Sequence, residues 1–318
     1  MPDRWYYIAG IVLILCLGSI VLMTWIIPPQ PDPSPAPQTD KLAEILARGK
    51  IVIASQTNYP PWSDRKTGAI RTANTKCAPN EFTAGELTGF DVDVAVEVAR
   101  RLGVEPCFVT PPRTQVFSGS WADAWDIGLG SITITTERAK VLYFAQPYKT
   151  VPSVFYVSRN NTAFSNISDL SGKRIGVCAG CIQERYLQGS LEIPGEKIDY
   201  VVKNASIVAY NSDPLAFPHL VNGELDAVLV NMGSGQAAVN TGTPIKLLNG
   251  PVFYNYVAAA IDKKSARDPV PFTKKVTDII QEMHRDSTLQ KLIQPYYEQD
   301  LTIEASKFNI TALGQFPP

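Results

Sequence analysis

The sequence predicts an α/β fold made of two similar units, and two observations support this. A strand, a helix and a second strand follow one another between residues 50 and 110, and the same alternation returns between residues 173 and 231. Such a succession is typical of a parallel sheet with right-handed crossovers. The chain has 318 residues, 45% of them hydrophobic, which is enough for a large domain or two lobes with a sizeable core.

The first unit opens with a short amphipathic helix over residues 40–48, followed by the strand KIVIAS. The prolines and aromatic residues of YPPW, residues 59–62, force a loop. GFDVDVAVEVARRLG then predicts a helix that Asp91 can cap and Gly103 ends, because its valines and leucine recur every four residues. EPCFVT is the next strand.

The second unit begins with KRIGVCAG, a strand that runs into a glycine loop. CIQERYLQG begins a helix, SIVAYNS is a strand, residues 214–222 form a helix, and DAVLVN is a strand. The end of the chain, residues 271–298, predicts two helical pieces with a break around Asp286 and Ser287.

The stretch GSITITTERAK carries the first candidate binding residues. Its alternation predicts a strand with one buried face, with Ser131 and Thr133 on the same side. Arg138 would lie in the first turn of the helix that follows. Unpaired N–H groups at a helix start and a guanidinium both favour an anion, so Arg138 can grip a carboxylate. The alternative is a surface arginine paired with Glu137.

The N-terminal region predicts a membrane anchor and a spacer. Residues 5–27 contain no charged side chain, and this segment is long enough to cross a hydrocarbon core of ~30 Å. Arg4 precedes them and the next basic residue is Lys41, so the N-terminus is expected in the cytoplasm. A cleaved signal peptide is the alternative, although no small-x-small site follows. We therefore expect a membrane-anchor helix over residues 1–27 and a proline-rich linker over residues 28–39.

Charge and motifs narrow the function classes. The net charge is −1 and no basic block stands out, which argues against nucleic-acid binding. There is no G-x-S-x-G, H-E-x-x-H or phosphate-loop motif, so neither an enzyme nor a cofactor is expected. His219 and His284 flank no cysteine, so no metal site is expected either.

Four cysteines lie beyond the apolar segment, and an even number in an oxidising compartment suggests two disulfides. Cys107 is on a strand expected to neighbour the one before the loop of Cys77, which favours a Cys77–Cys107 bond. Cys178 and Cys181 are three residues apart on one turn, which favours a second bond. The alternative for CAGC, between a strand and a helix, is a thioredoxin-like redox site.

Several stretches together resemble a known family. YPPW, LTGFDVDVAVEVARRLGV, WDIGLGSITITTERAKVLYFAQPY, SGKRIGVCAG and NGELDAVLV occur in this order. They are similar to the extracytoplasmic solute-binding proteins of polar amino acid ABC transporters, family 3. The resemblance spans about residues 41–298. It implies a type II periplasmic-binding-protein-like clamp over residues 40–318, with two crossover strands and a ligand cleft between the lobes.

The same resemblance implies lobe boundaries and partners. Lobe 1 would comprise about residues 40–146 and 256–318, and lobe 2 about residues 148–255. The chain would serve an ABC transporter permease. From the N-terminal segment we expect a single-pass helix that holds it on the extracytoplasmic side of the cell membrane, and we expect a monomer. A ligand sensor that acts on a membrane partner is one alternative, and a dehydratase-like enzyme on the same fold is another.

The family's binding positions can be placed on this sequence. Arg138 would hold the ligand carboxylate, with Ser131 and Thr133 completing the hydrogen bonding. Tyr59 and Trp62 follow the first strand, where the family stacks an aromatic ring on the ligand. Core packing is the alternative for both rings. Arg113 aligns near a position that often packs on the ligand side chain. The alternative for Arg113 is a solvated surface arginine.

Three positions depart from the family pattern. Cys181 stands where a hydroxyl residue usually follows the glycine. Asn231 stands where an aspartate often binds the ligand ammonium, and Gln56 stands where relatives that bind basic ligands carry an acid. A buried ammonium without a counter-charge is costly. We therefore expect a neutral or acidic amino acid, or a small carboxylate without an amine.

Overall fold

The computed structural model describes residues 40–297 and 299–316. The predicted anchor and linker, residues 1–39, lie outside the described residues. Within the described ranges, no helix combines the length and the apolar character that crossing a bilayer requires.

The first sheet has six strands in the order β4-β6-β1-β7-β14-β8 and forms the centre of what we call lobe 1. As predicted, its central strands are parallel: Lys50 of β1 lies opposite Glu105 of β6, and Ile53 lies opposite Ile127 of β7. The strands are β1 (Lys50–Ala54), β4 (Phe82–Thr83), β6 (Glu105–Val109), β7 (Ile127–Gly128), β8 (Leu142–Phe144) and β14 (Ala260–Asp262).

The second sheet has five strands in the order β11-β10-β12-β9-β13 and forms the centre of lobe 2. β10 pairs in parallel with both β11 and β12, as the strand–helix–strand pattern predicts. The strands are β9 (Lys149–Ser158), β10 (Arg174–Cys178), β11 (Ser206–Tyr210), β12 (Ala227–Asn231) and β13 (Ile245–Val257). A small third sheet, β2-β3-β5, contains Asn58–Tyr59, Ser63–Arg65 and Leu87–Thr88.

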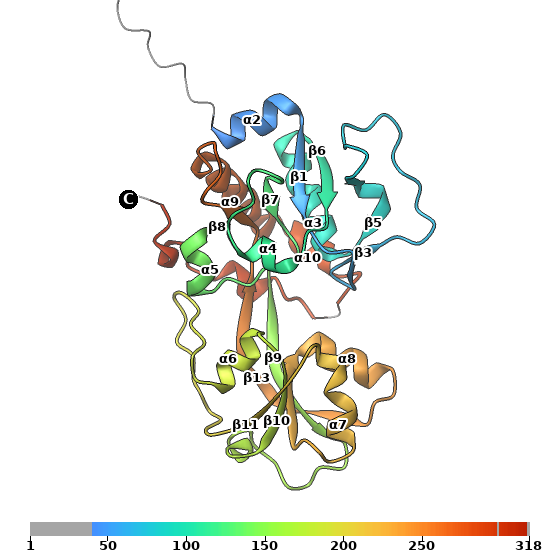
Figure 1. Cartoon of the computed structure of the whole chain (residues 1–318), viewed down its shortest axis with the longest axis vertical. Coiled ribbons are helices and arrows are strands. Elements are labelled where there is room, and N and C mark those ends of the chain that lie inside the picture. Colours follow the sequence, from blue (N-terminus) through green and yellow to red (C-terminus); the bar gives the residue numbers. More distant parts are fainter. Residues whose placement is uncertain (1–39, 298, 317–318) are drawn as a thin grey trace, which may run out of the picture. The chain divides into compact units, whose positions relative to one another are not determined.

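The two lobes are connected by the antiparallel pair β9 and β13 (Figure 1). Their register runs from Ile245 opposite Ser158 to Val257 opposite Lys149, with an irregularity after Leu248. Beyond β13 the chain enters the first sheet as β14, so both crossings between the lobes belong to one strand pair.

Local capping explains where the helices of lobe 1 begin and end. The Asp40 carboxylate accepts from the N–H of Ala43 at 2.8 Å and caps α2. Gly49, with φ of 67°, ends α2, and Gly103 ends α3 in the same left-handed conformation, as predicted. The apolar faces of α2, α3 and α9 bury Ile45, Phe90 and Phe272 in one core with the first sheet.

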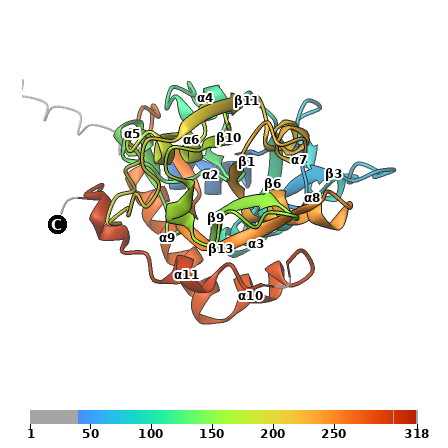
Figure 2. The same cartoon turned by 90° about the horizontal axis from the view of Figure 1, so that it is seen from below.

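The helices in the described residues are α2 (Lys41–Arg48), α3 (Phe90–Leu102), α4 (Arg113–Phe117), α5 (Thr136–Val141), α6 (Ile182–Leu187), α7 (Phe217–Val221), α8 (Met232–Asn240), α9 (Val270–Arg285), α10 (Thr288–Ile293) and α11 (Ile303–Ser306). The 3-10 turns are η1 (Ala84–Glu86), η2 (Ile167–Leu170), η3 (Asp213–Leu215) and η4 (Ile310–Leu313). The break between α9 and α10 falls at Asp286 and Ser287, as predicted. The segment before α11 lies beside β9, where the N–H of Thr150 donates to the carbonyl of Leu301 at 2.7 Å (Figure 2).

Two local predictions are wrong. Ser131 has φ of 53°, which an extended strand does not allow, so GSITITTERAK forms no continuous strand. Only Thr133 makes a bridge, to Val257 of β13. Asp91 does not cap α3 either, because Gly89 is the capping residue and the Asp91 side chain faces Lys149 in the interior.

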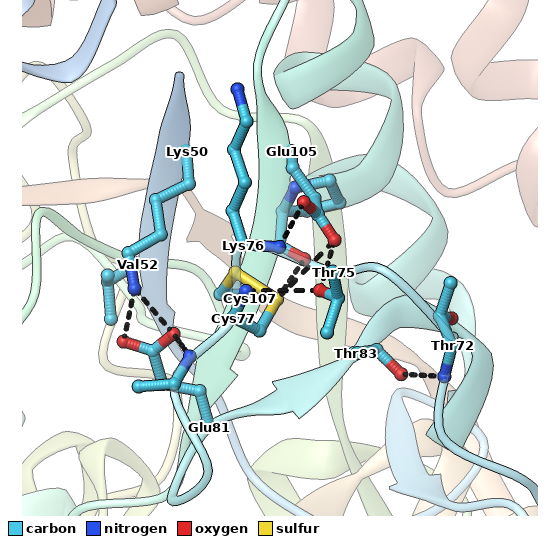
Figure 3. Close-up of a disulfide and its surroundings, with 12 residues drawn as sticks. Lys50, Val52, Thr72, Thr75, Lys76, Cys77, Glu81, Thr83, Glu105 and Cys107 are labelled. Carbon is cyan, nitrogen blue, oxygen red and sulfur yellow. Dashed lines mark hydrogen bonds and ion pairs between the residues drawn. A yellow bond between two sulfur atoms is a disulfide. The ribbon is translucent and has the colours of Figure 1, made fainter. Parts of the chain in front are cut away.

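Both predicted disulfides are present. Cys77 and Cys107 join the long loop before β4 to the middle of β6, with their Cα atoms 5.3 Å apart (Figure 3). The neighbouring Glu105 carboxylate holds the same loop, accepting from the N–H of Lys76 at 2.8 Å (Figure 3). Cys178 and Cys181 are joined at the junction of β10 and α6 in lobe 2.

Candidate functional site

The candidate binding residues follow the carboxyl ends of parallel strands in both lobes. In lobe 1, Gln56 follows β1, Arg113 follows β6 and Ser131 follows β7. In lobe 2, Cys181 follows β10 and Asn231 ends β12. Ligands of open α/β sheets bind outside the carboxyl ends of the strands. The fold therefore gathers the residues that the sequence proposes into two facing sets.

Two arginines in lobe 1 share one aromatic ring. The guanidinium carbon of Arg138 lies 3.8 Å from the ring centroid of Phe117, and that of Arg113 lies 5.3 Å from the same centroid. Arg138 also donates from Nη1 to the carbonyl of Thr133 at 2.8 Å. Within the described residues, no carboxylate lies at ion-pair distance from either guanidinium. Two like charges on one ring, without a counter-ion, favour an anion beside them.

Arg138 has no carboxylate partner in the described residues because the adjacent Glu137 pairs with another arginine. The Glu137 carboxylate pairs with Arg185, which belongs to α6 of lobe 2. The alternative of an Arg138–Glu137 salt bridge is therefore not what the structure shows. Burial, and then the charges of Arg113 and Arg185, lower the pKa of Arg138 to about 10. An anionic ligand would offset both causes.

The Ser131 hydroxyl is engaged in the interior of lobe 1. It donates to Asp91 Oδ2 at 2.7 Å and accepts from Lys149 Nζ at 3.0 Å. Ser131 is buried, and it lies in a network with an ion pair rather than open to the cleft. Of the two hydroxyl residues predicted beside Arg138, Thr133 is the one that contacts the arginine, through its carbonyl.

Tyr59 and Trp62 have different surroundings. Tyr59 is half-buried, with the guanidinium carbon of Arg113 at 5.8 Å from its ring centroid. Trp62 is 5% exposed and stacks on Tyr297 with 5.1 Å between ring centroids. Lys149 Nζ lies 3.4 Å from the ring centroid of Trp62. Trp62 thus packs against Tyr297 and Lys149, and Tyr59 lies beside Arg113.

A cavity of about 810 Å³ lies between residues of the two lobes. Tyr59 and Trp62 line it from lobe 1, and Asn231 and Ser234 line it from lobe 2. The arginines do not line this cavity. Tyr59 belongs to both regions, because it lines the cavity and the guanidinium carbon of Arg113 lies 5.8 Å from its ring centroid. Burial raises the pKa of Tyr59, while Arg113 and Asn231 lower it.

Gln56 supports Arg113 instead of contacting a basic ligand. With its amide oxygen turned toward the guanidinium, Gln56 accepts from Nη1 of Arg113 at 2.8 Å and from Nε at 3.1 Å. These bonds fix the arginine next to Tyr59 while leaving its charge uncompensated. A glutamine at this position therefore holds the cation without neutralising it.

Asn231 offers a donor to the cleft. Its Oδ1 accepts from Nε2 of Gln183 at 2.6 Å and from Nδ2 of Asn255 at 3.0 Å. Both lone pairs of that oxygen are thus used by lobe 2 itself, and the amide NH2 remains for other partners. Cys181 bears no free thiol, since it is bonded to Cys178. The N–H groups of its loop are also used within lobe 2, because Gly180 donates to the Glu184 carboxylate at 2.6 Å and Cys181 donates to the carbonyl of Cys178 at 3.3 Å.

Comparison with known proteins decides the family. The model of bacterial extracellular solute-binding proteins, family 3, matches residues 70–299. The chain belongs to this family. Among curated relatives, the L-cystine-binding protein TcyJ of Escherichia coli K12 is 26% identical, covering 82% of this chain and 87% of the relative. The probable amino-acid-binding protein YxeM of Bacillus subtilis is 27% identical, covering 69% and 80%.

A third relative, the L-arginine-binding protein of Pseudomonas aeruginosa, is 30% identical over 63% of this chain and 69% of its own length. Solved structures confirm the two-lobed fold. An ancestral amino acid-binding protein, described as a precursor of cyclohexadienyl dehydratase, matches with a TM-score of 0.60 at 23% identity and covers 81% of this chain and 100% of its own. A mutant of the arginine-binding protein of T. maritima matches with a TM-score of 0.58 at 22% identity, with the same coverage.

Two residues near the site were not found from the sequence. Phe117 supplies the ring for both arginines, yet nothing in its local pattern distinguishes it from a core residue. Asp213 follows β11 at the same edge of the sheet as Asn231, and burial raises the pKa of its carboxyl to about 6. Its position after a parallel strand was a usable signal, because the other candidate residues were found in the same way.

Proposed function

We propose that this family member is the substrate-binding component of an ABC importer and binds a small polar solute with a carboxylate between its lobes. The amino-acid-binding names of its relatives support an amino acid or a similar solute. The observation that carries the proposal is the pair Arg113 and Arg138 on the Phe117 ring, with no carboxylate partner in the described residues. A ligand carboxylate is the missing counter-charge.

Arg138 would be the main anchor. Its planar guanidinium can form two parallel hydrogen bonds to a carboxylate. A hydrogen bond to a charged group contributes about 1.5–3 kcal/mol, against about 8 kcal/mol for a micromolar ligand. One arginine therefore supplies a large fraction of the affinity. Tyr59, beside Arg113, would pack on the bound solute.

The charges favour a neutral or acidic solute. Gln56 brings no acid to the site and instead holds Arg113 in place. Asn231 uses its oxygen within lobe 2, so it cannot accept from a basic group. A lysine or arginine side chain would meet the two guanidinium groups without an acid from either position, and an unpaired buried charge is costly.

A thermal-shift screen of the full-length chain tests this function. The panel contains glutamate, glutamine, lysine, arginine and small dicarboxylates, and native mass spectrometry shows whether a solute co-purifies. The largest stabilisation should come from an acidic or neutral carboxylate. If lysine or arginine gives the largest shift, the interpretation of Gln56 and Asn231 is wrong. Stabilisation by none of these compounds would contradict carboxylate binding itself.

The membrane, partner and reaction are part of the same proposal. Residues 1–27 would hold the binding domain on the extracytoplasmic side, next to a permease, and N-terminal sequencing of the native protein checks whether they are retained. Copurification with a permease would support transport, whereas copurification with a signalling receptor would support sensing. Because one similar structure is described as a dehydratase precursor, the solute should also be recovered and checked. Unchanged solute supports binding, and altered solute supports an enzyme.

A further inference from the structure

We propose that Asp213 binds the cationic group of the ligand, and this inference rests on the proposed function. Asp213 is the first residue of η3 and follows β11 at the carboxyl edge of the lobe 2 sheet. Because β11, β10 and β12 are parallel neighbours, this is the edge that also carries Asn231. Within the described residues, no basic side chain lies at ion-pair distance from its carboxylate.

The surroundings of Asp213 place it beside the cavity. Ser234, in the first turn of α8, lines the cavity. Burial raises the pKa of the Asp213 carboxyl, and the Ser234 side chain opposes this rise. The next residue, Pro214, also lines the cavity. In lobe 1, burial raises the pKa of the Tyr59 hydroxyl, Arg113 lowers it and Asp213 raises it further. Tyr59 also lines the cavity, and the guanidinium carbon of Arg113 lies 5.8 Å from its ring centroid.

The distribution of charge then describes the ligand. Lobe 1 presents Arg113 and Arg138, which require an anionic group. Lobe 2 presents the half-buried carboxylate of Asp213, which requires a cationic one. Asn231 cannot take that role, because its oxygen already accepts from Gln183 and Asn255. A ligand that satisfies all three charged groups carries both a carboxylate and an amine, and the amine lies at Asp213.

The test compares an amino acid with the same acid lacking the α-amine. The probes are L-glutamate with glutarate and L-glutamine with glutaramate, titrated by calorimetry into the full-length chain. The wild type should bind the amine-bearing member of at least one pair about tenfold more tightly, the effect of one charge-assisted hydrogen bond. Asp213→Asn should reduce that preference to about twofold or less. Asp199→Asn, an exposed acid of lobe 2, should leave it unchanged.

Moving the carboxylate from position 213 to position 231 provides a second part of the experiment. Asn231→Asp in the Asp213→Asn background should restore part of the preference for the amine, because it returns an acid to the same edge of the sheet. A preference that survives Asp213→Asn overturns the role of Asp213, while loss of all binding in Arg138→Ala still supports the proposed function. A wild type that binds the deaminated acids equally well overturns it too. A wild type that binds no probe overturns both this role and the proposed class of solute.

Discussion

Lys149 Nζ lies 2.6 Å from Asp91 Oδ1, and both side chains are 0% exposed. The pair joins the first residue of β9, where the chain passes into lobe 2, to the first turn of α3 in lobe 1. Ser131 and the Trp62 ring complete the surroundings of the ammonium. An ion pair at this position fixes the base of the connecting strands against lobe 1.

Breaking this pair should strongly destabilise the fold. Asp91→Asn leaves the Lys149 ammonium buried without a counter-charge, which costs about 3–5 kcal/mol of unfolding free energy. The double variant Asp91→Leu with Lys149→Met should lose less than Asp91→Asn alone, since it buries no charge. Urea denaturation of the wild type and both variants measures the difference. A double variant less stable than Asp91→Asn would contradict this account of the pair.

Phe117 should matter for binding through its ring. Phe117→Leu keeps apolar volume but removes the π-face that both Arg113 and Arg138 contact. A cation–π contact is worth about 0.5–2 kcal/mol, so affinity for a stabilising amino acid should fall by roughly 2- to 30-fold. Phe82→Leu is the matched control, because the Phe82 ring also carries an arginine, Arg65 at 4.7 Å, but on β4. Equal effects of the two variants would exclude a specific role for Phe117.

The two disulfides should differ in their contribution to stability. Cys77–Cys107 closes a loop with a sequence separation of 30, and Cys178–Cys181 one with a separation of 3. The chain-entropy model assigns about 3.6 kcal/mol to the first and about 1.6 kcal/mol to the second. Replacing both cysteines of one pair by alanine, in separate variants, should therefore lower the melting temperature more for Cys77–Cys107. The opposite order in calorimetry would show that loop closure does not set these contributions.

Asp213 should make the ligand-free protein sensitive to pH. Burial raises the pKa of its carboxyl from 3.8 to about 6, opposed by the hydrogen bond from Ser234. Tyr59 is the titratable group of lobe 1 whose pKa Asp213 influences. The Asp213 carboxyl therefore binds its proton more tightly in the folded state than in the unfolded state. Its contribution to the free energy of unfolding falls as the pH rises from 3.8 to about 6.

Asp213→Asn removes the loss of stability that accompanies ionisation of this carboxyl. The variant should melt a few degrees above the wild type at pH 7 without ligand, and the gain should vanish at pH 4, where Asp213 is protonated in the folded state. Differential scanning calorimetry at both pH values measures this. A gain of the same size at pH 4 would mean that the effect arises from packing rather than from a buried charge.

Much of the fold was predictable because its signals are local. The valines of α3 repeat at helical spacing, Gly103 marks its end, and the β-branched run of β1 predicts a buried strand. Ser131 was not predictable in the same way. Its left-handed backbone conformation interrupts a regular alternation of polar and apolar residues, and a serine in the sequence does not indicate such a conformation. The expected strand was wrong for this reason.

The site was predictable only where one segment carries the chemistry. Arg138 was proposed from its place at a helix start, and the structure leaves it without an acid partner in the described residues. The contact between Gln56 and Arg113 joins the loops after two different strands, so no local pattern contains it. Asp213 lies far along the chain from Tyr59, and only the folded structure brings its neighbour Pro214 to the cavity that Tyr59 lines.

The central claim is that Arg138 holds a ligand carboxylate, and isothermal titration of the full-length chain with its most stabilising amino acid tests it most directly. Arg138→Ala should weaken binding by about tenfold or more, because at least one charge-assisted hydrogen bond is lost. Arg138→Lys should recover only part of it, since an ammonium cannot form two parallel bonds. Arg100→Ala, an exposed arginine paired with Glu97, should bind as the wild type does. Unchanged affinity in a folded Arg138→Ala variant would contradict the account.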